Sequence, residues 1–120
     1  MGDPIVINGT HGRDDPERAT LAFVVGNVAA SADQDAIVLL TIDGVWNATE
    51  GYADDVHEAG FEPLATVVRS FVANGGEIWV CGACAEPRGI TDDDLVEGAR
   101  IVSAVQAVEV LAGGASALSF

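Results

Sequence analysis

An almost continuous apolar run from Ala36 to Ile42 is the feature that most constrains how this chain can fold. The run is too short for a typical helix, and it lacks the polar–apolar alternation of a strand with one exposed face. It therefore predicts a β-strand buried on both faces, as in parallel sheets that helices cover on both sides. Two further apolar stretches, Pro4 to Asn8 and Glu77 to Cys81, predict strands of the same kind.

Segments with helical spacing separate these strands. Asp14-Asp15-Pro16-Glu17 combines a capping residue, an early proline and acidic side chains, as a helix start does. Pro63 opens a second helix that ends at Asn74-Gly75-Gly76, and Thr91-Asp92-Asp93-Asp94 has the spacing that opens a third. The residues expected on the inner faces of the three helices are Leu21, Val24, Val25 and Val28, then Leu64, Val67, Val68, Phe71 and Val72, then Leu95, Ala99 and Val102.

The last part of the chain continues the alternation. A short strand is expected near Val105, a helix from Ala107 to Leu111, and a last strand from Ala115 to Phe120. Alternating strands and helices predict an α/β fold, a three-layer α/β/α sandwich with a mainly parallel sheet of about five strands. The 120 residues suffice for one compact core, so we expect a single domain over residues 1–120.

The charge balance of the chain is strongly acidic. Its 19 Asp and Glu residues face five arginines and no lysine, which gives a net charge of −14. Molar salt shortens the Debye length to about 3 Å, so a surface of this kind repels itself only weakly there. The composition favours adaptation to high salt, as in a halophilic archaeon. It argues against nucleic acid and anionic membrane partners, because phosphate groups need basic contacts.

The sequence also predicts where the protein works. No apolar run approaches the roughly 18 residues of a membrane-spanning helix, and no signal peptide precedes the first strand. The two cysteines are too few for the disulfide framework of a small secreted protein. A cytoplasmic location is expected.

Both cysteines lie in Cys81-Gly82-Ala83-Cys84, directly after the third predicted strand. The carboxyl edge of parallel strands is where open α/β folds build their sites. A thiolate there can act as a nucleophile, and a neighbouring cation such as Arg88 would favour the ionised form. The strand end would hold Cys81 rigidly, whereas Cys84, on a loop that continues to Ile90, would act as a second thiol. The competing interpretation is that Cys81 is a small, inert core residue.

A long segment from Val45 to Phe61 follows the second strand and contains Trp46, Tyr52 and His57. Segments of this length without regular structure are often functional. The two aromatic residues would cap the sheet edge or line a pocket or a subunit contact. His57 is typical of a solvated loop residue, although it could meet the cysteines at the carboxyl edge.

Two other kinds of site stay open at this edge. Cys81 and Cys84 could bind zinc together with His11 and His57, the only histidines, although the spacing is not that of a zinc finger. The turn Gly9-Thr10-His11-Gly12 before a helix could hold an anion, but it lacks a complete nucleotide-binding motif. We assign no metal and no cofactor to the chain.

The stretch from Ile78 to Ile90 resembles the DsrE/DsrF-like family of small sulfur-relay proteins. In sulfur-carrying members a cysteine follows the third strand, and an Arg-Gly-apolar step comes shortly after it. Cys81 and Arg88-Gly89-Ile90 match that pattern. Segments within residues 10–20 and 40–46 are similar to an archaeal and bacterial subgroup of the family.

The resemblance implies a homo-oligomer, a trimer or a hexamer of α/β/α subunits, with Cys81 near a subunit edge. Relay proteins carry sulfane sulfur as a cysteine persulfide and pass it between donor and acceptor proteins, and Cys81 is the position that inherits this role. Cys84 departs from the pattern, since relay proteins commonly carry an apolar residue there. A second thiol can discharge a persulfide by forming a disulfide.

Two hypotheses follow from these residues. In the first, Cys81 carries the sulfur, Cys84 resolves or shields it, and Arg88 favours the thiolate, in a sulfur carrier or sulfurtransferase rather than a turnover enzyme. In the second, the chain is a non-catalytic oligomeric module that binds a ligand or partner beside Trp46, with structural or zinc-bound cysteines.

Overall fold

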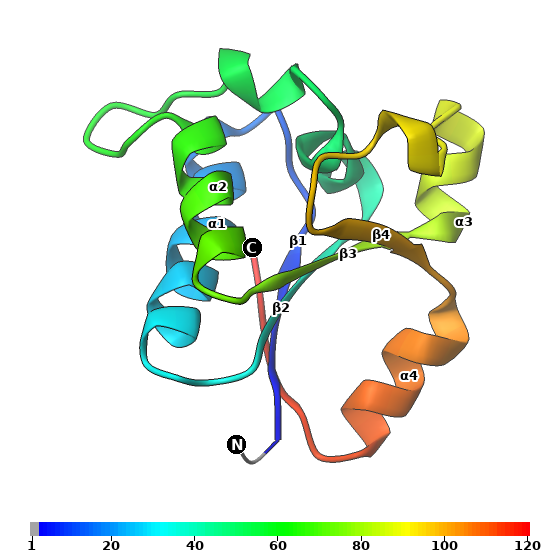
Figure 1. Ribbon diagram of the computed structural model, residues 1–120. Helices are drawn as coiled ribbons and strands as arrows, with labels where there is room; N and C mark the ends of the chain where they lie inside the picture. The colour runs from blue at the N-terminus through cyan, green and yellow to red at the C-terminus, as the bar shows by residue number, and fades with distance from the viewer. Residues whose placement is uncertain (1–2) are drawn as a thin grey trace.

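The computed structural model describes residues 3–120, which form a five-stranded sheet in the order β4-β3-β2-β1-β5 with all neighbouring strands parallel (Figure 1). The predicted fold class, an α/β arrangement with a mainly parallel sheet of about five strands, is confirmed. The strands are β1 (Ile5–Gly9), β2 (Ala36–Leu40), β3 (Glu77–Cys81), β4 (Ala99–Val102) and β5 (Ser116–Ser119), and the helices are α1 (Pro16–Ser31), α2 (Leu64–Ala73), α3 (Gly82–Ala85) and α4 (Ala104–Ala112).

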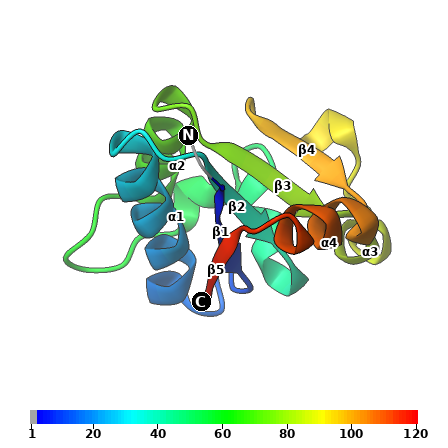
Figure 2. The ribbon, with the colours of Figure 1, turned by 90° about the horizontal axis from the view of Figure 1, so that it is seen from below.

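Helices α1 and α2 cover one face of the sheet, and α4 packs on the other (Figure 2). Successive side chains of a strand point to opposite faces. Ile7, Val38 and Ile78 therefore enter the larger core under α1 and α2, whereas Ile37 and Trp79 pack on the side of α4. Because the central strands contribute to both cores, they need apolar residues at nearly every position, which explains the continuous apolar runs.

Helix α2 has the predicted buried face, but α1 does not. Of the residues expected on the inner face of α1, Val28 is 65% exposed and the other three are only partly buried. Phe23 is buried instead, together with several small residues. A Cβ on Gly26 would lie 2.9 Å from Val38 and 3.1 Å from the ring of Phe71, so glycine lets α1 approach the sheet and α2 closely.

The region from 91 to 105 differs most from the prediction. Thr91 and Asp94 form the expected capping box, but it closes a single 3-10 turn and not a helix. The fourth strand is β4 and not a segment near Val105, which lies on α4 and is 64% exposed. Ala99 and Val102, expected on a helix face, belong to this strand. Gly98 has a φ of +88° and its carbonyl accepts the N–H of the first buried residue of β3, so the chain joins the sheet here.

The last helix and the last strand are present as predicted, but their first residues differ from the predicted ones. Helix α4 begins at Ala104 and not at Ala107, because Ser103 and Gln106 cap each other at the helix start. It ends before Gly113, as expected. Within residues 3–120 no helix combines the length and the apolar character that crossing a bilayer requires.

Candidate functional site

The cysteine motif lies where β3 ends and a short helix begins. Cys81 is the last residue of β3, and Cys84 belongs to the single turn of α3. Both are half-buried free thiols. The predicted loop from Ala85 to Ile90 is wrong, because a 3-10 turn over Glu86–Arg88 continues directly from α3. Both thiols are therefore held by compact, hydrogen-bonded structure.

The surroundings of Cys84 keep its thiol protonated. Burial is the main reason why the pKa of Cys84 lies above its ordinary value of 9.0, and the neighbouring Cys81 side chain raises this pKa further. The Ile42 N–H, which donates to Cys84 Sγ at 3.2 Å, and the charge of Arg88 lower it, but they do not outweigh these effects. At neutral pH Cys84 thus keeps its proton.

Arg88 connects the segments that follow β2 and β3. Its Nε and Nη2 atoms donate to Asp43 Oδ1 at 3.2 and 2.9 Å, and its Nη1 atom donates to the Cys84 carbonyl at 3.0 Å. The Arg88 side chain is 26% exposed and that of Asp43 is 48% exposed. Because the Asp43 carboxylate offsets part of the guanidinium charge, Arg88 braces the cysteine turn as well as supplying positive potential.

Ile42 presents its N–H to Cys84 from a strained backbone conformation. Its φ is +53°, a region that β-branched residues avoid, and its side chain is 55% exposed. The turn around it is fixed against β1, because the Thr41 N–H donates to the Gly9 carbonyl at 3.0 Å and Gly44 packs directly on the same carbonyl. No sequence pattern points to Ile42, since its part in the site comes from its backbone and not from its side chain.

Trp46 and Tyr52 fasten the segments after β1 and β2 together. Their rings stack with centroids 6.0 Å apart. Tyr52 Oη accepts the N–H of Arg13 at 2.8 Å, and the Arg13 guanidinium lies 4.1 Å from the Tyr52 ring centroid. The segment expected to be irregular contains two 3-10 turns, Ile42–Ala48 and Tyr52–Asp55. A cavity of about 290 Å³, lined in part by Trp46, borders the residues that follow Arg88.

The histidines have partners of their own. His11 Nδ1 pairs with Asp14 at 2.6 Å, and the His11 carbonyl accepts from Asn47 at 2.8 Å. His57 is exposed and its Nε2 donates to the Phe61 carbonyl at 2.8 Å. Nowhere in residues 3–120 do three or more His, Cys, Asp or Glu side chains gather closely enough to hold a metal ion. The set of two cysteines and two histidines considered for zinc is therefore not assembled in this structure.

An all-parallel α/β sheet with two neighbouring free thiols at the end of a central strand defines a small dithiol protein of the α/β class. The chain belongs to the DsrE/DsrF-like family, whose family model matches residues 4–120. This is the family that the stretch around Cys81 resembles, so the predicted family is confirmed.

Two curated relatives come from archaea. The uncharacterized protein MJ0760 of Methanocaldococcus jannaschii is 33% identical over 102 residues, which cover 85% of this chain but 37% of that protein. The uncharacterized protein MK0008 of Methanopyrus kandleri is 26% identical over 87 residues, covering 72% of this chain and 69% of that protein. The chain thus spans little more than a third of the length of MJ0760.

Two solved structures have the same fold. The ychN protein from E. coli superposes with a TM-score of 0.81 at 18% identity, over 98% of this chain and 99% of that chain. MTH1491 from Methanobacterium thermoautotrophicum, a protein of unknown function, superposes with a TM-score of 0.72 at 22% identity, over 98% and 100% of the two chains. At these identities the likeness concerns the fold alone.

Proposed function

We propose that this chain is a sulfur-relay protein that carries sulfane sulfur as a persulfide on Cys81. The observation that carries the proposal is the thiol pair at the end of β3, in which Cys81 ends the strand and Cys84 follows in the first turn of α3, beside Arg88. Membership of the DsrE/DsrF-like family supports a sulfur-relay type of role. In this proposal Cys81 is the nucleophile, because it lies at the end of β3, the position that the family resemblance gives to the sulfur-carrying cysteine, and because Cys84 keeps its proton.

Loading is a sulfur transfer without net oxidation. The Cys81 thiolate attacks the outer sulfur of a donor persulfide, the S–S bond of the donor breaks, and the donor leaves as a thiolate that takes up a proton. A bond between Cys81 Sγ and the transferred sulfur forms in its place. The reverse attack by a thiolate of an acceptor protein unloads the carrier in the same way.

Cys84 allows a second outcome. Its thiolate can attack Cys81 Sγ in the persulfide, which forms a Cys81–Cys84 disulfide and releases hydrosulfide. The two thiols together lose two electrons and the sulfane sulfur gains them. Because the pKa of Cys84 is raised, this discharge is slow at neutral pH, and the persulfide survives long enough to be passed on. Arg88 holds the turn that carries Cys84 and adds positive potential for the anionic persulfide.

The test is peptide mass mapping after reduced protein has been treated with a low-molecular-weight persulfide. We expect one added sulfur on Cys81 in the wild type and in Cys84→Ser, and none in Cys81→Ser. Cys84→Ser should keep its sulfur longer and release less hydrosulfide. Equal labelling of Cys81→Ser and the wild type, or no labelling of any folded variant, would overturn the proposal.

We further propose that the chain forms a homo-oligomer through the outer face of α4, with the trimer or hexamer of the family resemblance as the expected assembly. Val105 and Val108 on this helix are 64% and 63% exposed. Val108→Asp should therefore shift the mass measured by light scattering toward the monomer. The matched control is Val28→Asp on α1, because Val28 is equally exposed, at 65%, and should leave the mass unchanged. A wild-type monomer would refute this assembly.

The cellular setting is part of the same proposal. Persulfide exchange requires reduced thiols, which the cytoplasm maintains. The net charge of −14 supports a cytoplasm rich in salt.

A further inference from the structure

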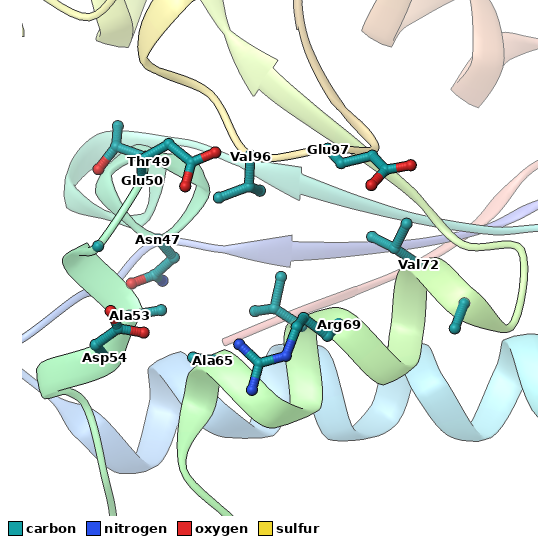
Figure 3. A pocket seen from close by; sticks show the side chains of 13 residues that line it. Asn47, Thr49, Glu50, Ala53, Asp54, Ala65, Arg69, Val72, Val96 and Glu97 are labelled. Atoms are coloured by element: carbon teal, nitrogen blue, oxygen red, sulfur yellow. The ribbon is translucent and has the colours of Figure 1, made fainter.

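We infer that the protein has a second binding site, for a small zwitterion of the amino-acid type, in a cavity of about 640 Å³. Pockets for small molecules typically measure about 300–1,000 Å³. The cavity lies between α2, the 3-10 turns after β2 and the segment before β4 (Figure 3). Neither cysteine lines it, nor do Arg88 and Asp43, so it is distinct from the thiol site and the inference goes beyond the proposed function.

A solvent-exposed guanidinium group without a partner in the described protein lines the cavity. Four of the five arginines form ion pairs with carboxylates, whereas Arg69 makes no hydrogen bond or ion pair with any other residue from 3 to 120. In a chain with 19 acidic residues an unpaired arginine is the exception. Arg69 extends from α2 along the cavity wall and can bind a carboxylate through two parallel N–H donors.

Acidic side chains line the cavity as well, without pairing with Arg69. In Figure 3, Glu50 and Glu97 lie on the side opposite α2, with Val96 between them, and Asp54 lies near the end of the second 3-10 turn. A ligand that spans the cavity therefore meets positive charge on one side and negative charge on the other. Three carboxylates disfavour a multiply charged phosphate, whereas a bound carboxylate and ammonium together satisfy both sides.

Asn47 adds an unsatisfied acceptor to the wall. Asn47 is 1% exposed, and its Nδ2 atom donates to the His11 carbonyl at 2.8 Å. Its Oδ1 atom has no hydrogen-bond partner among the described residues. The bond to a carbonyl settles which end of the amide is the oxygen. Buried acceptors are normally paired, so this oxygen would gain a partner if the Asn47 side chain turned toward an N–H donor of a ligand in the cavity.

Apart from Thr49 and Gly51, the remaining surface is apolar and suits a small aliphatic side chain. It consists of Ala53, Ala65, Val68, Val72, Ala73 and Val96. A pocket of this kind binds the body of a ligand by burial, while a few polar groups determine its orientation. The three parts together define the ligand class: a carboxylate for Arg69, an ammonium for the acidic side and Asn47, and a short aliphatic group between them.

The experiment is an NMR titration of ¹⁵N-labelled protein with L-leucine and two analogues that each lack one charge. 3-Methylbutylamine has no carboxylate and 4-methylpentanoate has no ammonium group. We expect L-leucine to shift the amide signals of Ala65, Val68 and Val96 with a Kd of about 1 mM or lower. Each analogue should bind at least about tenfold more weakly, because it can make a charged contact with only one side of the cavity.

The variant that tests the site is Arg69→Ala, and Arg18→Ala is its control. Both changes remove one positive charge, but Arg18 pairs with Asp15 at the start of α1 and lies outside the cavity. Arg69→Ala should weaken L-leucine binding at least about tenfold, whereas Arg18→Ala should not change it. The inference fails if L-leucine causes no shifts, if the analogues bind equally well, or if the two variants behave alike. Circular dichroism verifies that both variants are folded.

Discussion

Replacing Gly44 with alanine is the sharpest test of how the site is positioned. Gly44 lies in the turn after β2 and packs on the backbone of β1. A Cβ at this position would overlap the Gly9 carbonyl oxygen, and it would lie 2.8 Å from the Gly9 carbonyl carbon and 3.2 Å from the Thr10 nitrogen. These are backbone atoms, which cannot rotate away as a side chain can, so the whole turn must move off β1.

The cost of Gly44→Ala can be estimated from the contacts of the turn. Overpacking of a tight contact costs about 1–3 kcal/mol. Moving the turn also weakens two hydrogen bonds worth about 0.5–1.5 kcal/mol each. They join the Thr41 N–H to the Gly9 carbonyl at 3.0 Å and the Gly44 N–H to the Thr41 carbonyl at 2.9 Å. We therefore expect a loss of about 2–6 kcal/mol, a large part of the roughly 5–15 kcal/mol of a typical domain.

Urea unfolding at equilibrium measures this loss, and Gly51→Ala is the control. Gly51 lies in the same segment with a φ of +83°, but nothing lies within 4 Å of a Cβ there. Its replacement should cost only the backbone strain, about 1–2 kcal/mol. The Gly44 variant should also react more slowly with iodoacetamide at Cys84, because the Ile42 N–H, which lowers the pKa of this thiol, moves away with the turn. If the Gly44 variant unfolds at the wild-type midpoint, or no earlier than the Gly51 variant, this account of the turn is wrong.

Four other predictions concern the site and the surface. At pH 7 Cys84 should be alkylated more slowly than a free cysteine, because burial raises the pKa of its thiol. Peptide mapping follows the alkylation rate, which should still rise above pH 9.0. A rate that reaches its plateau below that pH would contradict this prediction. The hydrogen bond with His11 lowers the pKa of Asp14 below 3.8. Asp14 therefore adds stability that is fully present above pH 3.8 and is lost as the pH falls through the folded-state pKa. The urea unfolding midpoints of the wild type and Asp14→Asn should accordingly differ near neutral pH and converge in acid. Arg88→Lys cannot form the three hydrogen bonds of the guanidinium and should lose about 1–3 kcal/mol in urea unfolding along with part of the sulfur transfer; an unchanged midpoint would remove its bracing role. The melting temperature should rise steadily between about 0.1 M and 3 M KCl, and a curve that is flat above about 0.5 M would argue against adaptation to high salt.

The sequence allowed the central strands and the thiol motif to be predicted because their signals are local. Apolar runs identify β1, β2 and β3, and the position of Cys81 follows from the end of β3. The buried face of α1 could not be predicted, because it depends on how closely Gly26 lets the helix approach Val38. The capping pattern at Thr91 is real, but pairing of β4 with β3 overrides any helix beyond Gly98.

The same distinction applies to the sites. Cys84 and Arg88 are chemically distinctive and stand near each other in the sequence, so a pattern finds them. Ile42 contributes a backbone N–H through a positive φ, which no side-chain pattern reveals. Arg69 and Asn47 are ordinary residues in the sequence, and only the packed structure shows that one lacks a partner for its charge and the other for its buried oxygen.

The pairing of β5 with β1 has a consequence for synthesis on the ribosome. Strand β1 is complete early, yet its second neighbour in the sheet is β5, and the Thr10 N–H and hydroxyl both donate to the Phe120 carbonyl across a separation of 110 residues. While the chain emerges, one edge of β1 stays unpaired, and contacts between such distant segments form slowly. The segment that carries His11 can therefore reach its final position only after translation has passed residue 120.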